Sequence, residues 1–519
     1  MENVSILWAD DEIDLLKPHI MFLKDKGYNV VTTNNGIEAV EIIKTQPYGF
    51  DIVFLDEQMP GLSGIETLMQ IKNSFPNLPV VMITKSEEER IMEEAIGSNI
   101  SDYLIKPVNP NQILLSITKN LKGKRLISEK TTHAYQQQFR NLGMEFSNRL
   151  NFSEWTEVYK KLVYWDIELE KSKDNSIIDV LKMQRVEASQ LFSRYVESNY
   201  LDWIAPSAKE RPVMSHTLIR DKVLPVVDDN QGMFLILIDN LRYDQWKVLQ
   251  PIIEEFYRVE RDEIFFSILP TTTQYARNSI FAGLLPTEIE KKYPKYWVNE
   301  DDEGTKNQFE SELLGEQLKR FGKDYKYSYH KILNLSAGRK LVETLPNLAG
   351  NKLNVIVYNF VDMLSHARTE MEVIRELADD EAAYRSITVS WFEHSPLLEI
   401  IKFLSGKKIP LMITSDHGSV RVESPVKIIG DKATNTNLRY KTGRSLSYNK
   451  KEVYEVKNPA DAFLPRTNVS SNYVFCRNTD FFAYPNNFNY YVNYYRNTFQ
   501  HGGISMEEIM VPLISLIPR

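Results

Sequence analysis

The sequence predicts an α/β protein of three parts, and three observations lead to that prediction. In residues 1–122, five short apolar segments alternate with amphipathic helical stretches, a pattern typical of a doubly wound parallel sheet. Residues 123–205 contain no proline, and their apolar residues recur at helical spacing, which predicts a helical bundle connector. In residues 206–519, apolar and helical segments alternate again and predict a second, larger α/β domain.

Composition limits the class of protein. The longest apolar runs, such as Met233–Ile238, are far shorter than the ~20 residues of a membrane span, so no span is expected. The N-terminus has neither a basic start nor an apolar signal core, and the single cysteine, Cys476, fits a reducing compartment. A cytoplasmic protein is therefore expected. The net charge of −8 argues against general coating of nucleic acid.

The strands expected in the first domain are Val4–Ala9, Val30–Thr33, Ile52–Leu55, Val80–Thr84 and Asp102–Ile105. Helical stretches such as Glu12–Lys26 and Glu87–Ile96 separate them. In a doubly wound sheet, functional groups lie at the carboxyl ends of the strands. The side chains at those ends are Asp10, Asp11, Asp56, Thr84 and Lys106.

These side chains suit phosphoryl transfer to a carboxylate. Clustered Asp10, Asp11 and Asp56 can hold one Mg²⁺, a hard ion that prefers oxygen ligands, and the ion makes Asp56 a competent nucleophile. Lys106 can pair with the phosphoryl oxygens. Thr84 can donate a hydrogen bond to the phosphoryl oxygens. The new negative charge shifts the conformational equilibrium of a loop, and Tyr103 is the candidate side chain that changes rotamer with that loop.

This constellation resembles the receiver domain of two-component response regulators, a flavodoxin-like fold. The matching segments are Leu55–Gly61, Met82–Lys85 and Tyr103–Pro107. The resemblance implies that Asp56 is the phosphoacceptor, that Asp10 and Asp11 help to bind Mg²⁺, and that a sensor histidine kinase is a partner. Thr84 and Lys106 would carry the signal. A flavodoxin-like sheet with ordinary surface acids is the alternative.

The connector has amphipathic helices but no chemical motif. Its apolar positions include Trp155, Val158, Leu162, Leu181 and Leu191, with charged residues between them. Plain packing, transmission of the receiver's state and a dimer interface all remain open for this segment.

The apolar runs of the third part end in candidate metal ligands. Met233–Ile238 is followed by Asp239, and Leu411–Thr414 is followed by Asp416 and His417. Val355–Phe360 precedes two further ligands, and the spacing of this pair places both on one face of a helical turn. The pair is Asp362 and His366, and a third histidine, His501, stands before two glycines near the C-terminus.

Three aspartates and three histidines suffice for two tetrahedral metal sites if one more oxygen contributes. The segment Leu269–Tyr275 offers threonine hydroxyls at the start of a helix. A hydroxyl close to a metal loses its proton more easily and becomes a nucleophile. Two metals ~4 Å apart could stabilise the entering and leaving oxygens on phosphorus.

From Met233 to the end, the pattern resembles the alkaline phosphatase superfamily. The resemblance implies two Zn²⁺ ions, one bound by Asp239, the nucleophilic threonine, Asp416 and His417, the other by Asp362, His366 and His501.

The nucleophile has two candidates. Thr273 stands ten residues before Gly283, as family members have it, and is modestly favoured, while Thr271 follows Pro270 in a helix-cap position. Arg277 is a candidate substrate-binding residue. Sulfate esters are disfavoured because sulfatases need a Cys or Ser in the nucleophile position, and neither is present.

Two segments bear on the substrate. Lys427–Lys451 has seven basic residues against one acid and could steer an anionic substrate or form a solvated loop, with Lys441 and Arg444 as candidate contacts. Phe481–Phe499 has nine aromatic residues, which could stack on nucleotide bases, although strand or core packing is favoured.

A receiver (1–122) joined by a helical connector (123–205) to a PglZ-type alkaline phosphatase superfamily domain (206–519) resembles the response regulators of type IX protein secretion. That resemblance implies a zinc-dependent phosphodiesterase acting on linear or cyclic oligonucleotides. It also implies a homodimer on phosphorylation and a secretion-machinery or sigma-factor partner. The alternative is a non-catalytic regulatory module, in which the metal ions only stabilise the fold and which acts through protein partners. A transcription factor is disfavoured because no basic helix-turn-helix follows the receiver.

Overall fold

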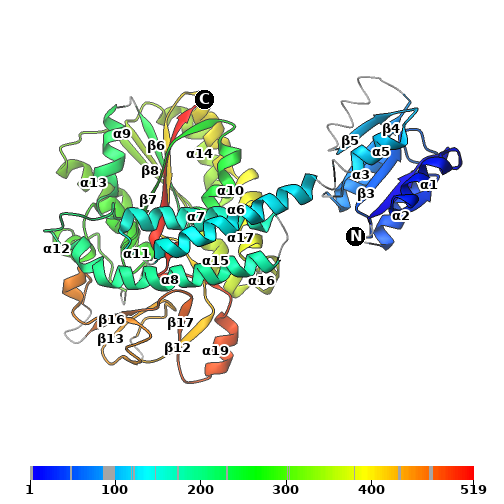
Figure 1. Ribbon diagram of the computed structural model, residues 1–519. Helices are drawn as coiled ribbons and strands as arrows, with labels where there is room; N and C mark the ends of the chain where they lie inside the picture. The colour runs from blue at the N-terminus through cyan, green and yellow to red at the C-terminus, as the bar shows by residue number, and fades with distance from the viewer. Residues whose placement is uncertain are drawn as a thin grey trace. The chain divides into compact units, whose positions relative to one another are not determined.

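The computed structural model describes residues 4–46, 49–76, 78–85, 100–117, 120, 123–146, 148–171, 175–229, 232–300, 302, 304–378, 380–430, 434–466 and 471–519. The chain forms two units, Met1–Gln136 and Gln137–Arg519 (Figure 1).

The first unit is a five-stranded parallel sheet in the order β2-β1-β3-β4-β5. Its strands are β1 (Ser5–Ala9), β2 (Asn29–Thr33), β3 (Ile52–Asp56), β4 (Val80–Thr84) and β5 (Asp102–Ile105). Its helices are η1 (Ile13–Leu16), α1 (Lys17–Asp25), α2 (Gly36–Thr45), α3 (Gly64–Ser74) and α5 (Pro110–Ile117). The predicted doubly wound sheet is confirmed, whereas the predicted helix Glu87–Ile96 lies outside the described residues.

Every side chain of β3 and β4 is buried, as expected for central strands with helices on both faces. One face packs into a core with α2 and α3, and the other with α1 and α5. Helix α3 begins sharply because the Ser63 side chain accepts from the Glu66 amide while Glu66 accepts from the Ser63 amide.

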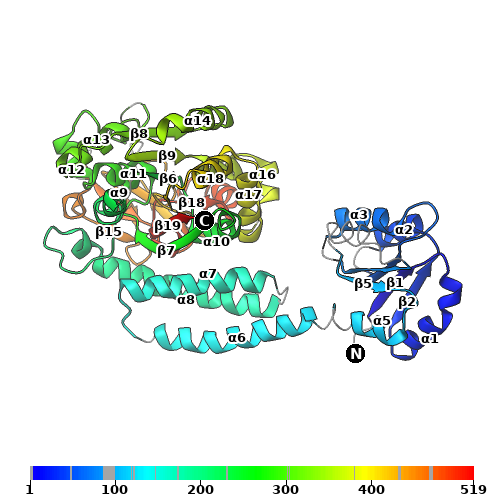
Figure 2. The ribbon, with the colours of Figure 1, turned by 90° about the horizontal axis from the view of Figure 1, so that it is seen from above.

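The helical connector is confirmed as α6 (Gly123–Phe146), α7 (Phe152–Glu170) and α8 (Asn175–Ile204). Helices α7 and α8 lie side by side in the second unit (Figure 2). Trp155 of α7 is buried and its ring meets Phe192 and Tyr195 of α8. The apolar positions at helical spacing therefore form the seam between the two helices.

The second unit is built around a six-stranded sheet in the order β7-β19-β10-β6-β9-β8. Its strands are β6 (Met233–Ile238), β7 (Tyr257–Phe266), β8 (Tyr327–Ile332), β9 (Leu353–Tyr358), β10 (Leu411–Thr414) and β19 (Met510–Pro518). The four strands β10, β6, β9 and β8 are parallel, and β19 pairs antiparallel with both β10 and β7. Strands β6, β9 and β10 were predicted from their apolar runs, whereas β7, β8 and β19 were not predicted, although β19 is itself an apolar run.

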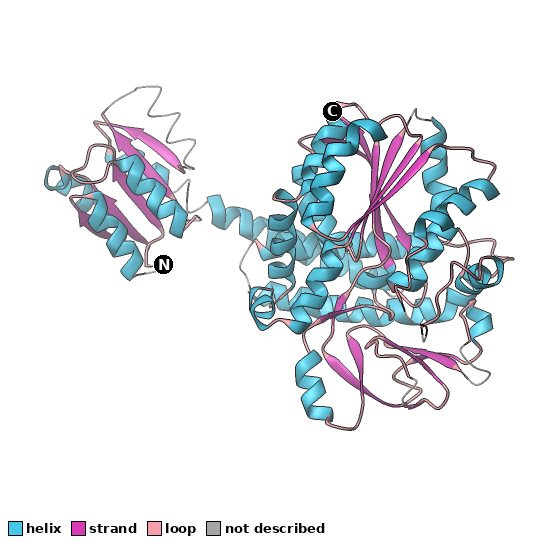
Figure 3. Ribbon diagram, turned by 180° about the vertical axis from the view of Figure 1, so that it is seen from behind, coloured by secondary structure: helices cyan, strands magenta, loops and turns pink. Residues whose placement is uncertain are grey.

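Helices cover both faces of this sheet (Figure 3). They include α10 (Tyr243–Ile253), α11 (Thr273–Ala282), α13 (Glu310–Arg320), α14 (Leu335–Leu348), α15 (Phe360–Glu370), α17 (Glu381–Glu393) and α18 (Pro396–Gly406). Shorter helical segments are η3 (Ile219–Val223), α9 (Leu224–Asp229), α12 (Pro286–Lys292), α16 (Glu372–Leu377), η4 (Pro459–Ala462) and α20 (Met506–Ile509).

Small sheets and one helix form a layer beyond the carboxyl ends of β6 and β10 (Figure 1). They are β11 (Val420–Arg421), β12 (Ser424–Ile429), β13 (Tyr440–Gly443), β14 (Ser447–Tyr448), β15 (Tyr454–Val456), β16 (Asn472–Phe475), β17 (Asp480–Ala483), α19 (Phe488–Tyr495) and β18 (Phe499–Gln500). This layer holds the predicted basic and aromatic segments. Among the described residues, none of the helices combines the length and the apolar composition that crossing a bilayer requires.

Candidate active site

The first unit gathers three carboxylates at the carboxyl ends of β1 and β3. Ligand oxygens of Asp10, Asp11 and Asp56 lie within 4.8 Å of one another. The Lys106 ammonium is 2.9 Å from Asp10 Oδ2 and 3.0 Å from Asp56 Oδ1. Burial raises the pKa of Asp56 to about 6 against the opposing effect of Lys106. Thr84 is buried at the end of β4 and Tyr103 is half-buried on β5.

The second unit gathers Asp239, Asp416 and His417 at neighbouring strand ends. Strands β6 and β10 are parallel neighbours with Leu237 opposite Thr414, so the residues that follow them must meet. All three side chains are buried, and their ligand atoms lie within 4.8 Å of one another. The sequence-predicted group is thus brought together in space.

The Thr273 hydroxyl lies against this group. Its Oγ1 is 3.4 Å from Asp239 Oδ1 and 3.2 Å from His417 Nε2. Helix α11 begins at Thr273, and its C-cap is Gly283, whose φ of +58° is the left-handed conformation that favours glycine.

Thr271 has a different environment. Its hydroxyl accepts from the Gly502 amide at 3.0 Å and donates to Gly503 O at 3.0 Å. The N-cap of α11 is Thr272, so the expectation that Thr271 caps this helix is wrong. The proline before Thr271 suggested the cap, but the helix starts one residue further along. Thr271 instead fixes the turn that follows His501.

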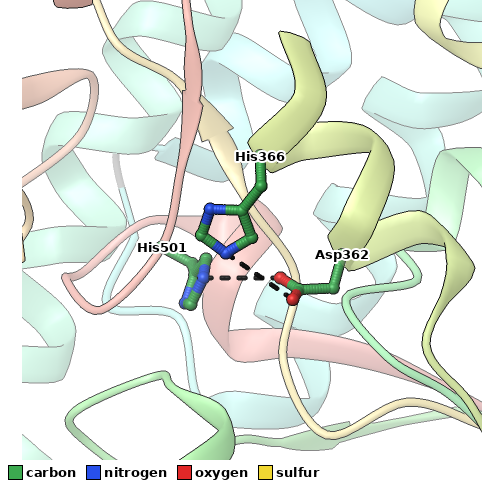
Figure 4. A group of neighbouring side chains, drawn as sticks. All are labelled: Asp362, His366 and His501. Carbon is green, nitrogen blue, oxygen red and sulfur yellow. Dashed lines mark ion pairs between the residues drawn. The ribbon is translucent and has the colours of Figure 1, made fainter. Parts of the chain in front are cut away.

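Asp362, His366 and His501 form a second group (Figure 4). Asp362 and His366 project from one turn of α15, and their Oδ2 and Nε2 atoms are 3.6 Å apart. His501 Nε2 is 3.6 Å from Asp362 Oδ1. The His501 ring also stacks on His417 with centroids 4.3 Å apart, which joins the two groups into one site.

The donor atoms of both groups fit divalent metal ions. Asp362 Oδ1 and Asp416 Oδ2 are buried acceptors without a hydrogen-bond partner among the described residues, and both face imidazole nitrogens at 3.6 Å. Burial raises the pKa of Asp362 to about 6 and lowers the pKa of His501 well below its usual value. A divalent cation, such as zinc, bound between these carboxylate oxygens and imidazole nitrogens would offset the buried negative charge.

Arg277 holds one member of the first group, Asp239, in position. Its Nη1 donates to Asp239 Oδ2 at 2.8 Å and its Nε donates to Glu310 Oε1 at 2.6 Å. All three side chains are buried, and although burial pushes the pKa of Asp239 upward, Arg277 holds it below its usual value. Glu310, at the start of α13, was not predicted, because a single glutamate in an amphipathic helix has no distinguishing signal.

A cleft of about 710 Å³ opens over both groups. Besides Asp239, Thr273, Arg277, Asp362, His366 and His501, its lining includes Glu300, Lys306, Asn307, Asn437, Tyr440, Tyr494, Tyr495 and Gln500.

The predicted contacts Lys441 and Arg444 are not part of this lining. Lys441 is buried with its ammonium donating to Asn435 O at 2.7 Å, and Arg444 is exposed. Lys306, which had no sequence signal, lines the cleft instead.

The aromatic segment Phe481–Phe499 was expected either to pack in a strand or the core or to stack on nucleotide bases, and its residues divide between a buried and a cleft-lining position. Phe481 and Phe482 are buried in β17, which is core packing. Tyr494 and Tyr495 of α19 are half-buried and line the cleft. Of the residues in this segment, the rings that line the cleft are therefore those of Tyr494 and Tyr495.

Comparison with protein families defines the class of protein. Residues 6–118 match the response regulator receiver domain, and residues 125–204 match the PorX response regulator linker domain. Residues 218–516, more than half of the chain, match the BREX system PglZ alkaline phosphatase-like domain, and the chain belongs to this family. It is a receiver joined through a linker to a PglZ domain.

Individual relatives match over shorter stretches. The transcriptional regulatory protein ZraR of Klebsiella oxytoca is 34% identical over 142 residues, 27% of this chain and 32% of that protein. A cyclic di-GMP phosphodiesterase of Thermotoga maritima is 27% identical over 164 residues, 28% of this chain and 44% of that protein. A receiver domain structure from Clostridium thermocellum aligns with 28% identity and a TM-score of 0.23 over 24% of this chain and 98% of that one. The chain thus spans less than half the length of these two curated relatives.

Proposed function

We propose that this protein is a response regulator, phosphorylated on Asp56, whose PglZ domain is a zinc-dependent phosphodiesterase. One observation carries the proposal: a threonine hydroxyl lies 3.2 Å from His417 Nε2 within a cleft lined by two groups of metal-ligand side chains. A nucleophile, metal ligands and room for a diester substrate are the parts that phosphoryl transfer needs.

The residues would divide into two metal sites. One ion would be held by Asp239, Thr273, Asp416 and His417, and the other by Asp362, His366 and His501. When bound, two Zn²⁺ ions would stabilise the negative charge that develops on the oxygens around phosphorus. Arg277 keeps Asp239 in place, and the Thr271 contacts to Gly502 and Gly503 keep the His501 turn in place.

Thr273 is the proposed nucleophile. Its hydroxyl loses its proton and Oγ forms a bond to phosphorus as the bond from phosphorus to the leaving oxygen breaks, and the leaving oxygen takes up a proton and departs as an alcohol. The oxygen of a water molecule then bonds to phosphorus as the Oγ–phosphorus bond breaks, and a water proton goes to Oγ, which gives a phosphate monoester and the free threonine. The hydroxyl of Thr271 is occupied by two backbone groups of the His501 turn, which favours Thr273 over Thr271.

Oligonucleotides, linear or cyclic, are the proposed substrates. The cleft is far larger than a phosphate group requires, and its wall includes the rings of Tyr494 and Tyr495. Aromatic rings beside a phosphate-binding centre suit nucleotides, because every base offers a face for stacking. Lys306 adds a cation to the same wall.

The receiver supplies the control. Asp10, Asp11 and Asp56 would hold one Mg²⁺, and Thr84, Tyr103 and Lys106 would register the phosphoryl group. The proposed role in type IX secretion comes from the resemblance to the response regulators of that system, and residues 125–204 match a response regulator linker domain, that of PorX. The proposed partners are a sensor histidine kinase, a second copy of the chain after phosphorylation, and a component of the secretion machinery or a sigma factor. The proposed location is the cytoplasm.

Hydrolysis of bis-p-nitrophenyl phosphate by the purified, zinc-loaded full chain tests this function. Activity should be present in the wild type and fall to background in Thr273→Ala and Asp416→Ala. Thr344→Ala, an exposed threonine of α14, is the matched control and should retain full activity. Bound zinc without hydrolysis, together with intact regulation in Thr273→Ala, would favour the non-catalytic regulatory module instead.

A further inference from the structure

One face of α8 carries polar side chains that reach the segments around the active site. The four residues are Arg185, Ser193, Glu197 and Tyr200, and their helical spacing keeps them on one side of α8. Each of the four has a partner at least 69 positions further along the chain, in the PglZ domain. Residues at such separations come together only through the fold.

Tyr200 contacts the segment that leads to the nucleophile. Its buried hydroxyl accepts from the Leu269 amide at 2.8 Å and lies 3.5 Å from Leu269 O. Leu269 is four residues before Thr273. A shift of Tyr200 that lengthens this bond would leave the buried amide without a partner, because hydrogen bonds weaken steeply beyond their normal length.

Arg185 and Ser193 contact the segment that follows His501. Ser193 Oγ donates to Asn478 Oδ1 at 2.8 Å and lies 3.5 Å from Ile504 O. Arg185 Nη2 donates to Glu507 Oε1 at 2.8 Å, and its Nη1 pairs with Asp166 of α7 at 2.8 Å. The same helix face therefore holds both the 269–273 and the 501–508 segments.

The 501–508 segment in turn meets both ligand groups. Glu508 Oε1 accepts from the Gly503 amide at 2.8 Å, two residues from His501. Glu508 O accepts from the Gly418 amide at 3.3 Å, next to His417. Any side chain at position 418 would collide with Glu507 O, so these two turns are packed in direct backbone contact.

The connection toward the receiver reaches α8 at the same place. Helix α6 begins at Gly123 in the first unit, and its last residues belong to the second unit. There, the buried Gln184 donates to Phe139 O at 3.1 Å, one residue from Arg185 on α8. Lys161 of α7 also pairs with Glu145 of α6 at 2.7 Å. A displacement of α6 thus acts first on the part of α8 that holds Glu507.

We propose that α8 is the positioning element through which the phosphorylation state of the receiver changes the active-site geometry. Arg185 and Tyr200 are its principal contacts. Packed interfaces are bistable rather than continuously deformable, so a shift of a packed helix by about 1–2 Å would switch such a contact between formed and broken. This inference rests on the proposed hydrolase function, and it assigns the route by which that function is regulated.

The test compares phosphorylated with unphosphorylated full-length, zinc-loaded protein, using acetyl phosphate with Mg²⁺ as phosphodonor. The wild type should show a ratio of the two kcat values for bis-p-nitrophenyl phosphate that differs from one, and Asp56→Asn should show no change. In Arg185→Met and Tyr200→Phe the ratio should move to about one. Tyr200→Phe should also lower the kcat of the more active state at least about fivefold with a smaller change in KM, because misplaced catalytic groups cost kcat.

Two variants on the same helix are matched controls. Arg194→Met removes an exposed arginine, and Tyr195→Phe removes the hydroxyl of a ring that packs on Trp155 and Trp203. Both should keep the wild-type ratio. A merely structural role for Arg185 or Tyr200 would lower both kcat values equally and keep the ratio, and that result would overturn the proposal.

Hydrogen exchange gives a readout that does not depend on hydrolysis. Phosphorylation should change the exchange of the amides of residues 499–509 in the wild type, and Arg185→Met should abolish that change. No change in the wild type would overturn the proposal. An exchange response in a protein without hydrolysis would support the α8 route while refuting the hydrolase function.

Discussion

At the scale of single residues, the site depends on oppositely charged side chains that are paired with one another and buried away from water. Arg277, Asp239 and Glu310 are all buried, and each carboxylate is bound to one edge of the guanidinium. Removing one member of a buried charge group leaves its partners uncompensated, which costs more than the group contributes when intact.

Replacement of the arginine, Arg277→Met, should therefore destabilise the second unit by ~3–5 kcal/mol in the absence of metal. The loss should be smaller in zinc-loaded protein, because a cation bound by Asp239 would replace part of the missing charge. Thermal unfolding with and without zinc measures both values. Equal losses in the two conditions would show that Asp239 does not bind the metal.

Thr271 gives a prediction that separates positioning from nucleophilic attack. Thr271→Val removes a hydroxyl that satisfies the Gly502 amide and Gly503 O, and should cost ~1–3 kcal/mol of stability. It should also lower the zinc content, because His501 belongs to the same turn. Thr271→Ser should restore both properties. Full zinc content and full stability in Thr271→Val, with hydrolysis lost, would instead make Thr271 the nucleophile.

At the scale of elements, two lysines of the layer beyond the strand ends both lie over an aromatic ring but differ in burial. Lys441 lies 5.0 Å from the Tyr484 ring centroid and is buried, and Lys427 lies 5.0 Å from that of Phe488 and is exposed. Burial lowers the pKa of Lys441 to about 8.

Stability should respond to this lysine at alkaline pH. The pKa of Lys441 is lower in the folded protein than in the unfolded chain, so the unfolded chain binds more protons between about pH 8 and 10.5. The contribution of Lys441 to the free energy of unfolding therefore rises with pH in that range. The difference in melting temperature between wild type and Lys441→Met should therefore shift in favour of wild type from pH 7.5 to pH 10. Lys427→Met is the control and should show no such shift. A pH-independent difference for Lys441→Met would contradict the prediction.

The elements also explain how much could be predicted from the sequence. Asp239 and Asp416 directly follow buried strands, and parallel neighbours bring such residues to one edge, so a linear pattern was enough. The Arg185–Glu507 contact joins residues 322 positions apart, and the Arg277–Glu310 pair joins two helices. Neither contact leaves a local pattern, because each depends on packing between elements. Strands β7 and β8 escaped prediction for a related reason: their polar, half-exposed side chains interrupt the apolar runs.

At the scale of the whole molecule, the two units have separate cores and separate candidate metal sites. The receiver carboxylates lie in Met1–Gln136, and both ligand groups of the proposed zinc sites lie in Gln137–Arg519. An ion stabilises only the unit that binds it, because it binds the folded but not the unfolded form of that unit.

Zinc removal should therefore act on one unit alone. Chelation of zinc should lower the unfolding temperature of the second unit and leave that of the receiver unchanged, whereas Mg²⁺ alone should raise only the receiver's transition. At a thousandfold excess over its dissociation constant, an ion adds ~4 kcal/mol, so the shift should be several degrees. Differential scanning calorimetry of the full chain resolves the two transitions, and Asp416→Asn should lose most of the zinc response. A zinc response in the receiver's transition, or none in the second unit, would place the metals elsewhere. Either result would remove the basis for hydrolysis at Thr273.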